Sequence, residues 1–174
     1  MIKYYKNYLT DKECDHLIET FNNLFTPDLY NSPPVENALE LLDTAGLSEN
    51  RLYKMYQVNK SLFYTDKDNH NLGTDKFYNF DLQAFRIQMV DGTIDQIPLF
   101  HKHKVSFSFS VFLNDVKEGG ELEFKSGKIF KPIKGDLVYF SCEEPHRVRQ
   151  VSDKRYTLVG STYNDPLKVK IGLI

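Results

Sequence analysis

The stretch Ser106-Phe-Ser-Phe-Ser-Val-Phe-Leu113 alternates small polar residues with large apolar ones. Successive side chains of a β-strand point to opposite faces, so a period of two places all the apolar residues on one face and the serines on the other. The apolar set is Phe107, Phe109, Val111 and Leu113. The pattern predicts a strand over residues 105–113 with one face packed against a core.

Similar short segments rich in β-forming residues surround this strand on both sides. They cover residues 82–90, 122–124, 128–130, 137–140, 147–151 and 156–162, with turn signals at 91–92, 119–120, 127 and 135–136. Many short strands separated by glycine turns are typical of a sandwich or jelly roll. We therefore expect a mainly β (α+β) fold, with N-terminal helices supporting one sheet.

The N-terminal part of the chain carries helix signals instead. Thr10-Asp-Lys-Glu13 has the pattern of a capping box, and apolar residues at helical spacing follow it, which predicts a helix over residues 11–25. A weaker helix is expected over 34–45, while 48–80 combines loop with short strand or helix. We expect one domain over 1–174, in which 1–80 form helical and loop support with a lid and 81–165 form the core.

Composition narrows the class of protein. The chain has 174 residues, of which 41% are hydrophobic, and a net charge of −2, so bulk electrostatics favour neither nucleic acid nor an anionic membrane as a partner. Cys14 and Cys142 are far apart in sequence and are interpreted as reduced, structural thiols. With neither a signal peptide nor a membrane span in the sequence, we expect a cytoplasmic protein.

Three of the five histidines are candidates for a metal site. His101 and His103 are two residues apart, so on a strand both would point to one face, and His146 follows the predicted strand 137–140. His16 and His70 are assigned no chemistry. Neutral imidazoles bind Zn, Fe or Cu, but a pair of structural histidines on a sheet has the same spacing. Both interpretations stay open on the histidines alone.

Six short motifs, in this order along the chain, resemble those of the Fe(II)/2-oxoglutarate-dependent dioxygenases, in particular the prolyl-4-hydroxylase-like branch. They are His101-Lys-His103, Val111-Phe-Leu-Asn114, Gly119-Gly-Glu-Leu-Glu-Phe124, Pro132-Ile-Lys-Gly135, His146 and Arg155-Tyr-Thr157. The resemblance implies a double-stranded β-helix (jelly roll, cupin-like) over residues 82–163. It also implies an oxidoreductase that uses Fe(II) and 2-oxoglutarate, with ascorbate as a further cofactor, to hydroxylate a peptidyl residue, such as proline, or a small molecule.

The same resemblance assigns roles to individual residues. His101, His103 and His146 would hold the iron, and Arg155, with Thr157 two residues on, would bind the far carboxylate of 2-oxoglutarate through its planar fork. The alternative for Arg155 is an ordinary arginine on the surface of a strand, and the nine-residue gap from His146 favours the co-substrate role. The oligomeric state is left as monomer or homodimer.

His103 is the departure from the family, whose members carry an Asp at this position. Three outcomes compete: a working three-histidine site, a carboxylate from elsewhere such as Asp95 or Glu144, or a repurposed protein that binds a metal or small carboxylate without turnover. A shifted alignment that places Asp91 or Asp95 in the motif is a further possibility. A three-histidine cupin-like metalloenzyme that needs no 2-oxoglutarate would leave Arg155 without a special role. The sequence narrowly favours the working three-histidine site.

Overall fold

The computed structural model describes residues 1–24, 59–63, 76–77, 82–92, 100 and 107–162. One helix, α1 (Asp11–Leu24), stands among strands in this part of the chain. The strands are β1 (Ile2–Tyr5), β2 (Asn59–Phe63), β3 (Leu82–Asp91), β4 (Phe107–Phe112), β5 (Leu122–Phe124), β6 (Ile129–Phe130), β7 (Leu137–Ser141), β8 (His146–Val148) and β9 (Lys154–Thr162). Within these residues, no helix is long and apolar enough to cross a membrane.

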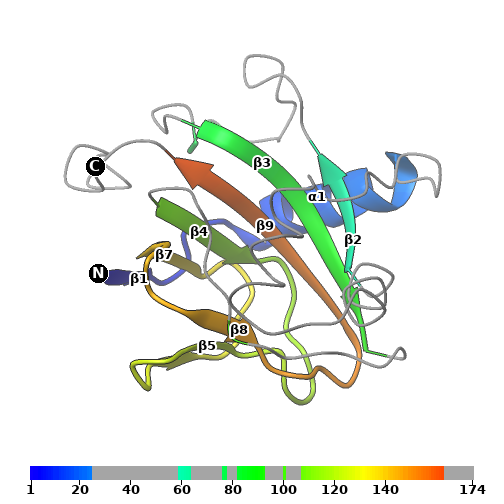
Figure 1. Ribbon diagram of the computed structural model, residues 1–174. Coiled ribbons are helices and arrows are strands. Elements are labelled where there is room, and N and C mark those ends of the chain that lie inside the picture. Colours follow the sequence, from blue (N-terminus) through cyan, green and yellow to red (C-terminus); the bar gives the residue numbers. More distant parts are fainter. Residues whose placement is uncertain (25–58, 64–75, 78–81, 93–99, 101–106, 163–174) are drawn as a thin grey trace, which may run out of the picture.

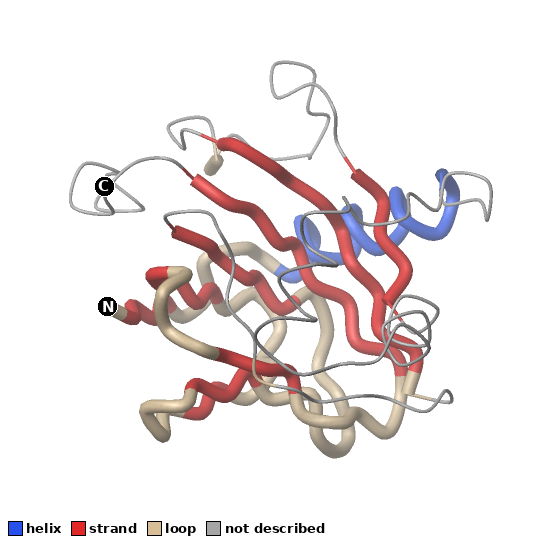
Figure 2. The backbone as a smooth tube through the Cα atoms, in the orientation of Figure 1, coloured by secondary structure: helices blue, strands red, loops and turns tan. Residues whose placement is uncertain are grey.

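The strands form two sheets in which every neighbouring pair is antiparallel. The larger sheet has the order β1-β7-β4-β9-β3-β2, and the smaller has the order β6-β5-β8. Figures 1 and 2 show the long strands β3 and β9 side by side, with the smaller sheet apart from them. The predicted mainly β architecture is confirmed, and it is a double-stranded β-helix.

Helix α1 covers the outer face of the larger sheet (Figure 1). Its buried residues Cys14, Leu17 and Phe21 are spaced three and four apart, so they form one stripe along the helix. The stripe packs against the apolar face of β4 that the alternating pattern predicts, through Phe109 and Val111. Apolar burial on both sides therefore holds the helix to the sheet.

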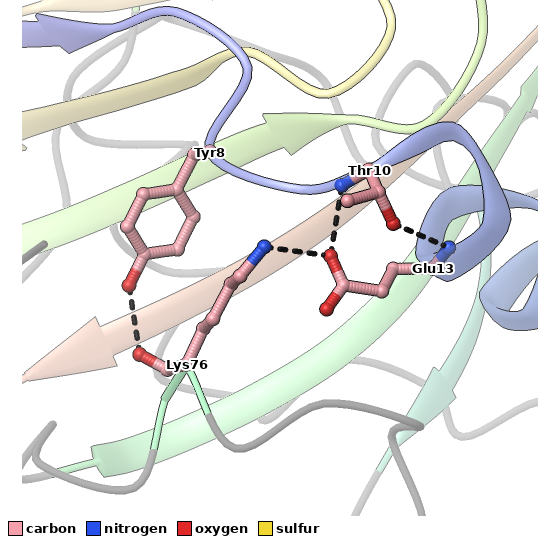
Figure 3. Close-up of polar contacts among 4 residues, drawn as sticks. All are labelled: Tyr8, Thr10, Glu13 and Lys76. Carbon is pink, nitrogen blue, oxygen red and sulfur yellow. Dashed lines mark hydrogen bonds and ion pairs between the residues drawn. The ribbon is translucent and has the colours of Figure 1, made fainter.

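The capping box at the start of α1 forms as predicted (Figure 3). The Thr10 amide donates to Glu13 Oε2 at 2.8 Å, and the Glu13 amide donates to Thr10 Oγ1 at 3.2 Å. Lys76 Nζ lies 2.8 Å from the same Glu13 oxygen, and Tyr8 donates its hydroxyl to the Lys76 carbonyl at 2.7 Å. The cap thus also ties residue 76 to the helix.

Replacing Thr10 by Ala removes the acceptor for the Glu13 amide. We expect the free energy of unfolding to fall by about 1 kcal/mol, as for other N-cap threonines. Chemical denaturation measures this change. Thr20→Ala removes a hydroxyl from the same helix without touching the cap, and we expect it to change stability by less than about 0.5 kcal/mol. Equal losses in the two variants would contradict the role of the cap.

The inner face of the larger sheet combines aromatic and polar side chains. Phe112, Val138 and Phe140 pack with Leu122 and Phe124 of the smaller sheet to form a second core cluster. The serines of β4 lie on this inner side: Ser108 and Ser110 are 5% and 7% exposed, and Ser108 donates to the Gly160 carbonyl at 3.0 Å. The polar face of the opening stretch therefore lines the interior between the sheets.

Strand β1 was not expected from the sequence. It pairs with β7, and Asp136, at the turn before β7, accepts hydrogen bonds from the Asn7 amide at 2.8 Å and from the Tyr4 hydroxyl. The turn itself is tight: a Cβ on Gly135 would lie 2.4 Å from the Leu9 carbonyl oxygen. These contacts join residues more than a hundred positions apart, which a local pattern cannot indicate.

Other boundaries differ slightly from the predictions. The strand expected over 147–151 is β8, which starts at His146 and ends at Val148, because the chain then turns away and Val151 makes only an isolated bridge with Gly119. The helix 11–25 is observed to residue 24. Within the region 48–80, β2 forms an edge of the larger sheet. The helix expected over 34–45 lies outside the described residues.

Candidate functional site

Arg155 projects from β9 into the interior between the two sheets. It is only 2% exposed, so the alternative of a surface arginine is wrong. Its Nε donates to the Gly120 carbonyl at 2.8 Å, its Nη1 lies 3.4 Å from Thr157 Oγ1, and its Cζ lies 5.4 Å from the centre of the Phe112 ring. Thr157 shares the inner face, as the spacing of two predicts.

No acidic side chain among the described residues pairs with the Arg155 cation. The four ion pairs in this part of the chain all involve other residues. Burial lowers the pKa of Arg155 to about 10, because removing the cation from water disfavours the charged form. A buried cation without an anion is costly, so the position suits a ligand that brings its own carboxylate.

His146 begins β8 and is 4% exposed. Its ring packs edge-on against Phe140, with 4.7 Å between centroids, and lies 5.9 Å from Phe124. Its Nδ1 is 3.0 Å from the Glu144 carbonyl oxygen, which can only accept. A neutral imidazole that donates from Nδ1 carries its lone pair on Nε2, the arrangement found in metal-bound histidines. The chemistry of His146 therefore fits a metal ligand.

Arg155 and His146 contact the same aromatic cluster. Arg155 lies against Phe112, His146 lies against Phe140 and Phe124, and these three rings belong to one core cluster between the sheets. The predicted co-substrate arginine and the third predicted metal ligand are thus brought together around one apolar wall.

Phe100 marks where the chain reaches the segment that holds the other two histidines. Its ring lies 4.3 Å from Arg147 Cζ, and Arg147 directly follows His146. Phe100 directly precedes His101 in the sequence. His101 and His103 themselves lie outside the described residues, and so do Asp95 and His70.

Asp95 and Glu144 are the acidic alternatives to His103 as a metal ligand, and the structure describes the second of them. Glu144 Oε1 accepts from the Ser126 amide at 3.3 Å, so this carboxylate is bound to the β5–β6 turn. No group of three or more His, Cys, Asp or Glu residues within the described ranges is placed to hold a metal ion.

Glu123 anchors Arg147 on the outer side of the smaller sheet. Its Oε2 lies 2.7 Å from Arg147 Nε and 2.8 Å from Arg149 Nε, and its Oε1 lies 3.0 Å from Arg149 Nη2. The hydrogen bonds from Arg149 and Arg147 lower the pKa of Glu123 to about 2. This network holds β8 at the position from which His146 points inward.

Glu123→Gln should change how stability depends on pH. The folded-state pKa is depressed, so the carboxylate stabilises the fold above its unfolded pKa of about 4.3, and this contribution is lost as pH falls towards 2. We expect the variant to be less stable than the parent at neutral pH, with the difference narrowing as pH falls below about 4 and disappearing only below the folded-state pKa of about 2. Urea unfolding at a series of pH values measures it. A constant difference across the range would contradict this role.

Sequence reasoning missed two contacts of the site. The Gly120 carbonyl that binds Arg155 is a backbone group, and no side-chain pattern marks it. The contact between Phe100 and Arg147 had a weak signal in the sequence, namely an aromatic residue next to His101 and an arginine next to His146.

Comparison with known proteins agrees with this geometry. The family model of the 2OG-Fe(II) oxygenase superfamily matches residues 88–163, which hold β4 to β9 with Arg155 and His146. The match covers less than half of the chain, and it agrees with the resemblance to the Fe(II)/2-oxoglutarate-dependent dioxygenases in the segment that carries Arg155 and His146. A comparison with curated proteins found no match.

Solved prolyl hydroxylases share the fold. A prolyl hydroxylase from Trichoplax adhaerens, in complex with a hypoxia inducible factor peptide fragment, has a TM-score of 0.63 at 14% identity, covering 98% of this chain and 86% of the other. A Pseudomonas putida prolyl-4-hydroxylase has a TM-score of 0.54 at 13% identity, covering 94% and 92%. A collagen prolyl hydroxylase from Paramecium bursaria Chlorella virus-1, solved as its 2OG complex, has a TM-score of 0.56 at 14% identity. The match covers 92% of this chain and 94% of the other.

Proposed function

We propose that this protein is an Fe(II)- and 2-oxoglutarate-dependent oxygenase that hydroxylates a peptidyl residue, with proline as the leading candidate. The observation that carries the proposal is Arg155: a buried cation without an acidic partner among the described residues, placed on the same aromatic cluster as His146. A dicarboxylate co-substrate provides the missing anion. The far carboxylate of 2-oxoglutarate would lie on Arg155 and its 2-oxo acid end would point towards the metal ligands.

The iron would be held by His146 together with His101 and His103. When bound, it supplies the activation of oxygen that the oxidative decarboxylation of 2-oxoglutarate requires. The chain contributes the rest. Arg155 and Thr157 orient the co-substrate, and Phe112, Phe124 and Phe140 form the apolar wall that keeps water away from the reacting groups.

We propose a working three-histidine site rather than a triad completed by a distant carboxylate. This is supported by the engagement of Glu144 with the β5–β6 turn and by the approach of Phe100 to Arg147 next to His146. Three neutral imidazoles leave the iron with one more unit of positive charge than two imidazoles and a carboxylate. That charge would strengthen its attraction for the anionic co-substrate.

A peptide substrate is supported by the solved structures that share the fold, one of which is a prolyl hydroxylase bound to a peptide fragment. A small molecule is the competing substrate class. The decisive assay supplies Fe(II), 2-oxoglutarate and oxygen with a library of proline-containing peptides, and measures succinate together with the mass gain of one oxygen atom. Hydroxylated peptide supports the proposal. Binding of 2-oxoglutarate without any succinate would indicate a binding module instead.

A further inference from the structure

Among the described residues, Gly120 makes the shortest hydrogen bond with the Arg155 side chain. The hairpin that carries it has two consecutive residues at positive φ, Gly119 at 75° and Gly120 at 70°, a conformation that side chains disfavour. The Gly120 amide donates to the Gln150 carbonyl at 3.1 Å, and Gly119 bridges to Val151. The hairpin is therefore fixed to the segment that leads into β9, on which Arg155 stands.

The Gly120 carbonyl determines which edge of the guanidinium is presented to a ligand. It accepts from Arg155 Nε at 2.8 Å, so the side of the fork that includes Nε is occupied. The contact of Nη1 with Thr157 is long, at 3.4 Å. The end of the fork, formed by Nη1 and Nη2, is left for the two parallel hydrogen bonds that a carboxylate makes with arginine.

The missing side chain of Gly120 also makes room for the stem of Arg155. A Cβ at this position would lie 3.0 Å from Arg155 Cδ and 3.3 Å from Val151 Cγ2. Both contacts are tighter than ordinary van der Waals separations, so either the arginine or the valine would have to move. The hairpin thus holds Arg155 by one hydrogen bond and by close packing.

We propose that Gly120 is a positioning residue that sets the chain length of the 2-oxo diacid accepted at this site. The inference rests on the proposed function. His146 and the other proposed metal ligands would fix one end of the co-substrate, and Arg155, held end-on, would fix the other, so the position of Arg155 would set the length of acid that spans the site. An arginine displaced by even a few tenths of an ångström would bind 2-oxoglutarate less well and would discriminate less against 2-oxoadipate, which has one more methylene.

Gly120→Ala tests this, with Gly127→Ala as the matched control. Gly127 is also at positive φ, 95°, but a Cβ added there would have nothing within 4 Å, so its replacement carries the backbone strain without disturbing Arg155. The readouts are the Kd values for 2-oxoglutarate and 2-oxoadipate by calorimetry with Fe(II) under anaerobic conditions, the Fe(II) affinity, and the separate KM and kcat. For Gly120→Ala we expect about a tenfold weaker Kd for 2-oxoglutarate, a smaller preference over 2-oxoadipate and unchanged Fe(II) affinity. The added Cβ shifts the guanidinium, and the loss of one charge-assisted hydrogen bond to the bound carboxylate has about this effect.

A second measurement tests whether the effect of Gly120→Ala on ligand binding depends on Arg155. Lysine keeps the charge at 155 but cannot both bond the Gly120 carbonyl and hold a carboxylate in two parallel bonds. We expect Arg155→Lys to lose the length preference, and Gly120→Ala to add little in the Arg155→Lys background. If Gly120→Ala does not fold, the test rests on Arg155→Lys alone. A variant that keeps the parent's preference for 2-oxoglutarate over 2-oxoadipate would overturn the inference.

The possible failures are distinguishable. If the parent protein binds no 2-oxoglutarate, the proposed function itself fails. If the parent binds it but Gly120→Ala behaves like Gly127→Ala, the proposed function stands and the positioning role of Gly120 is refuted.

Discussion

Replacing Arg155 by Met will remove 2-oxoglutarate binding while leaving the fold close to its parent stability. Truncating one partner of a buried charge pair costs about 2–5 kcal/mol of binding free energy, which is a rise in Kd of at least about thirtyfold. Stability responds differently, because removing a buried cation that has no acidic partner among the described residues offsets the loss of the bond to the Gly120 carbonyl. We expect the free energy of unfolding to change by no more than about 2 kcal/mol. Calorimetry and urea unfolding measure the two quantities.

Arg149→Met is the matched control. Arg149 stands on the same segment but on the outside, 42% exposed at its side chain and paired with Glu123, so it should keep the parent Kd for 2-oxoglutarate. A variant at Arg155 that binds 2-oxoglutarate normally would show that the buried arginine serves packing alone.

The second large effect concerns His103. We expect His103→Ala to weaken Fe(II) binding by more than about a hundredfold. Removing a residue that only hydrogen-bonds a metal ligand already lowers metal affinity by about 10–100-fold, and His103 is proposed to be a ligand itself. His16→Ala serves as the control, because His16 lies on α1, where its carbonyl accepts from Thr20. Metal titration followed by equilibrium dialysis measures the affinities.

His103→Asp separates a working three-histidine site from a decayed one. The carboxylate adds a negative charge beside the metal, so Fe(II) should bind at least as tightly as in the parent. In a site built for three imidazoles, however, turnover should fall. A rise in succinate formation in His103→Asp would instead mean that the parent histidine replaced a functional carboxylate.

The sequence indicated those features that depend on local pattern. The alternation in 106–113 predicted which face of β4 meets α1, and the Thr10–Glu13 spacing predicted the cap. The spacing of two in Arg155-Tyr-Thr157 predicted that Arg155 and Thr157 share a face, and both side chains are buried on it. In each case, the information lies within a few neighbouring residues.

Features that depend on contacts between distant segments could not be predicted from local sequence patterns. Strand β1 exists because Tyr4 and Asn7 meet Asp136 across the fold, and β8 ends early because the chain turns to follow the Gly119–Gly120 hairpin. The hydrogen bond from Arg155 to Gly120 involves a carbonyl that every residue type possesses. The roles of His101 and His103 stay predictions, since both residues lie outside the described part of the chain.

The most direct test of the central claim is an anaerobic titration followed by visible absorption. The protein is loaded with Fe(II) and then titrated with 2-oxoglutarate, and Arg155→Met is treated in parallel. We predict a charge-transfer band that saturates in the parent protein and fails to develop in the variant at the same concentrations. Absence of Fe(II) binding in the parent protein, or an equal band in both proteins, would contradict the account.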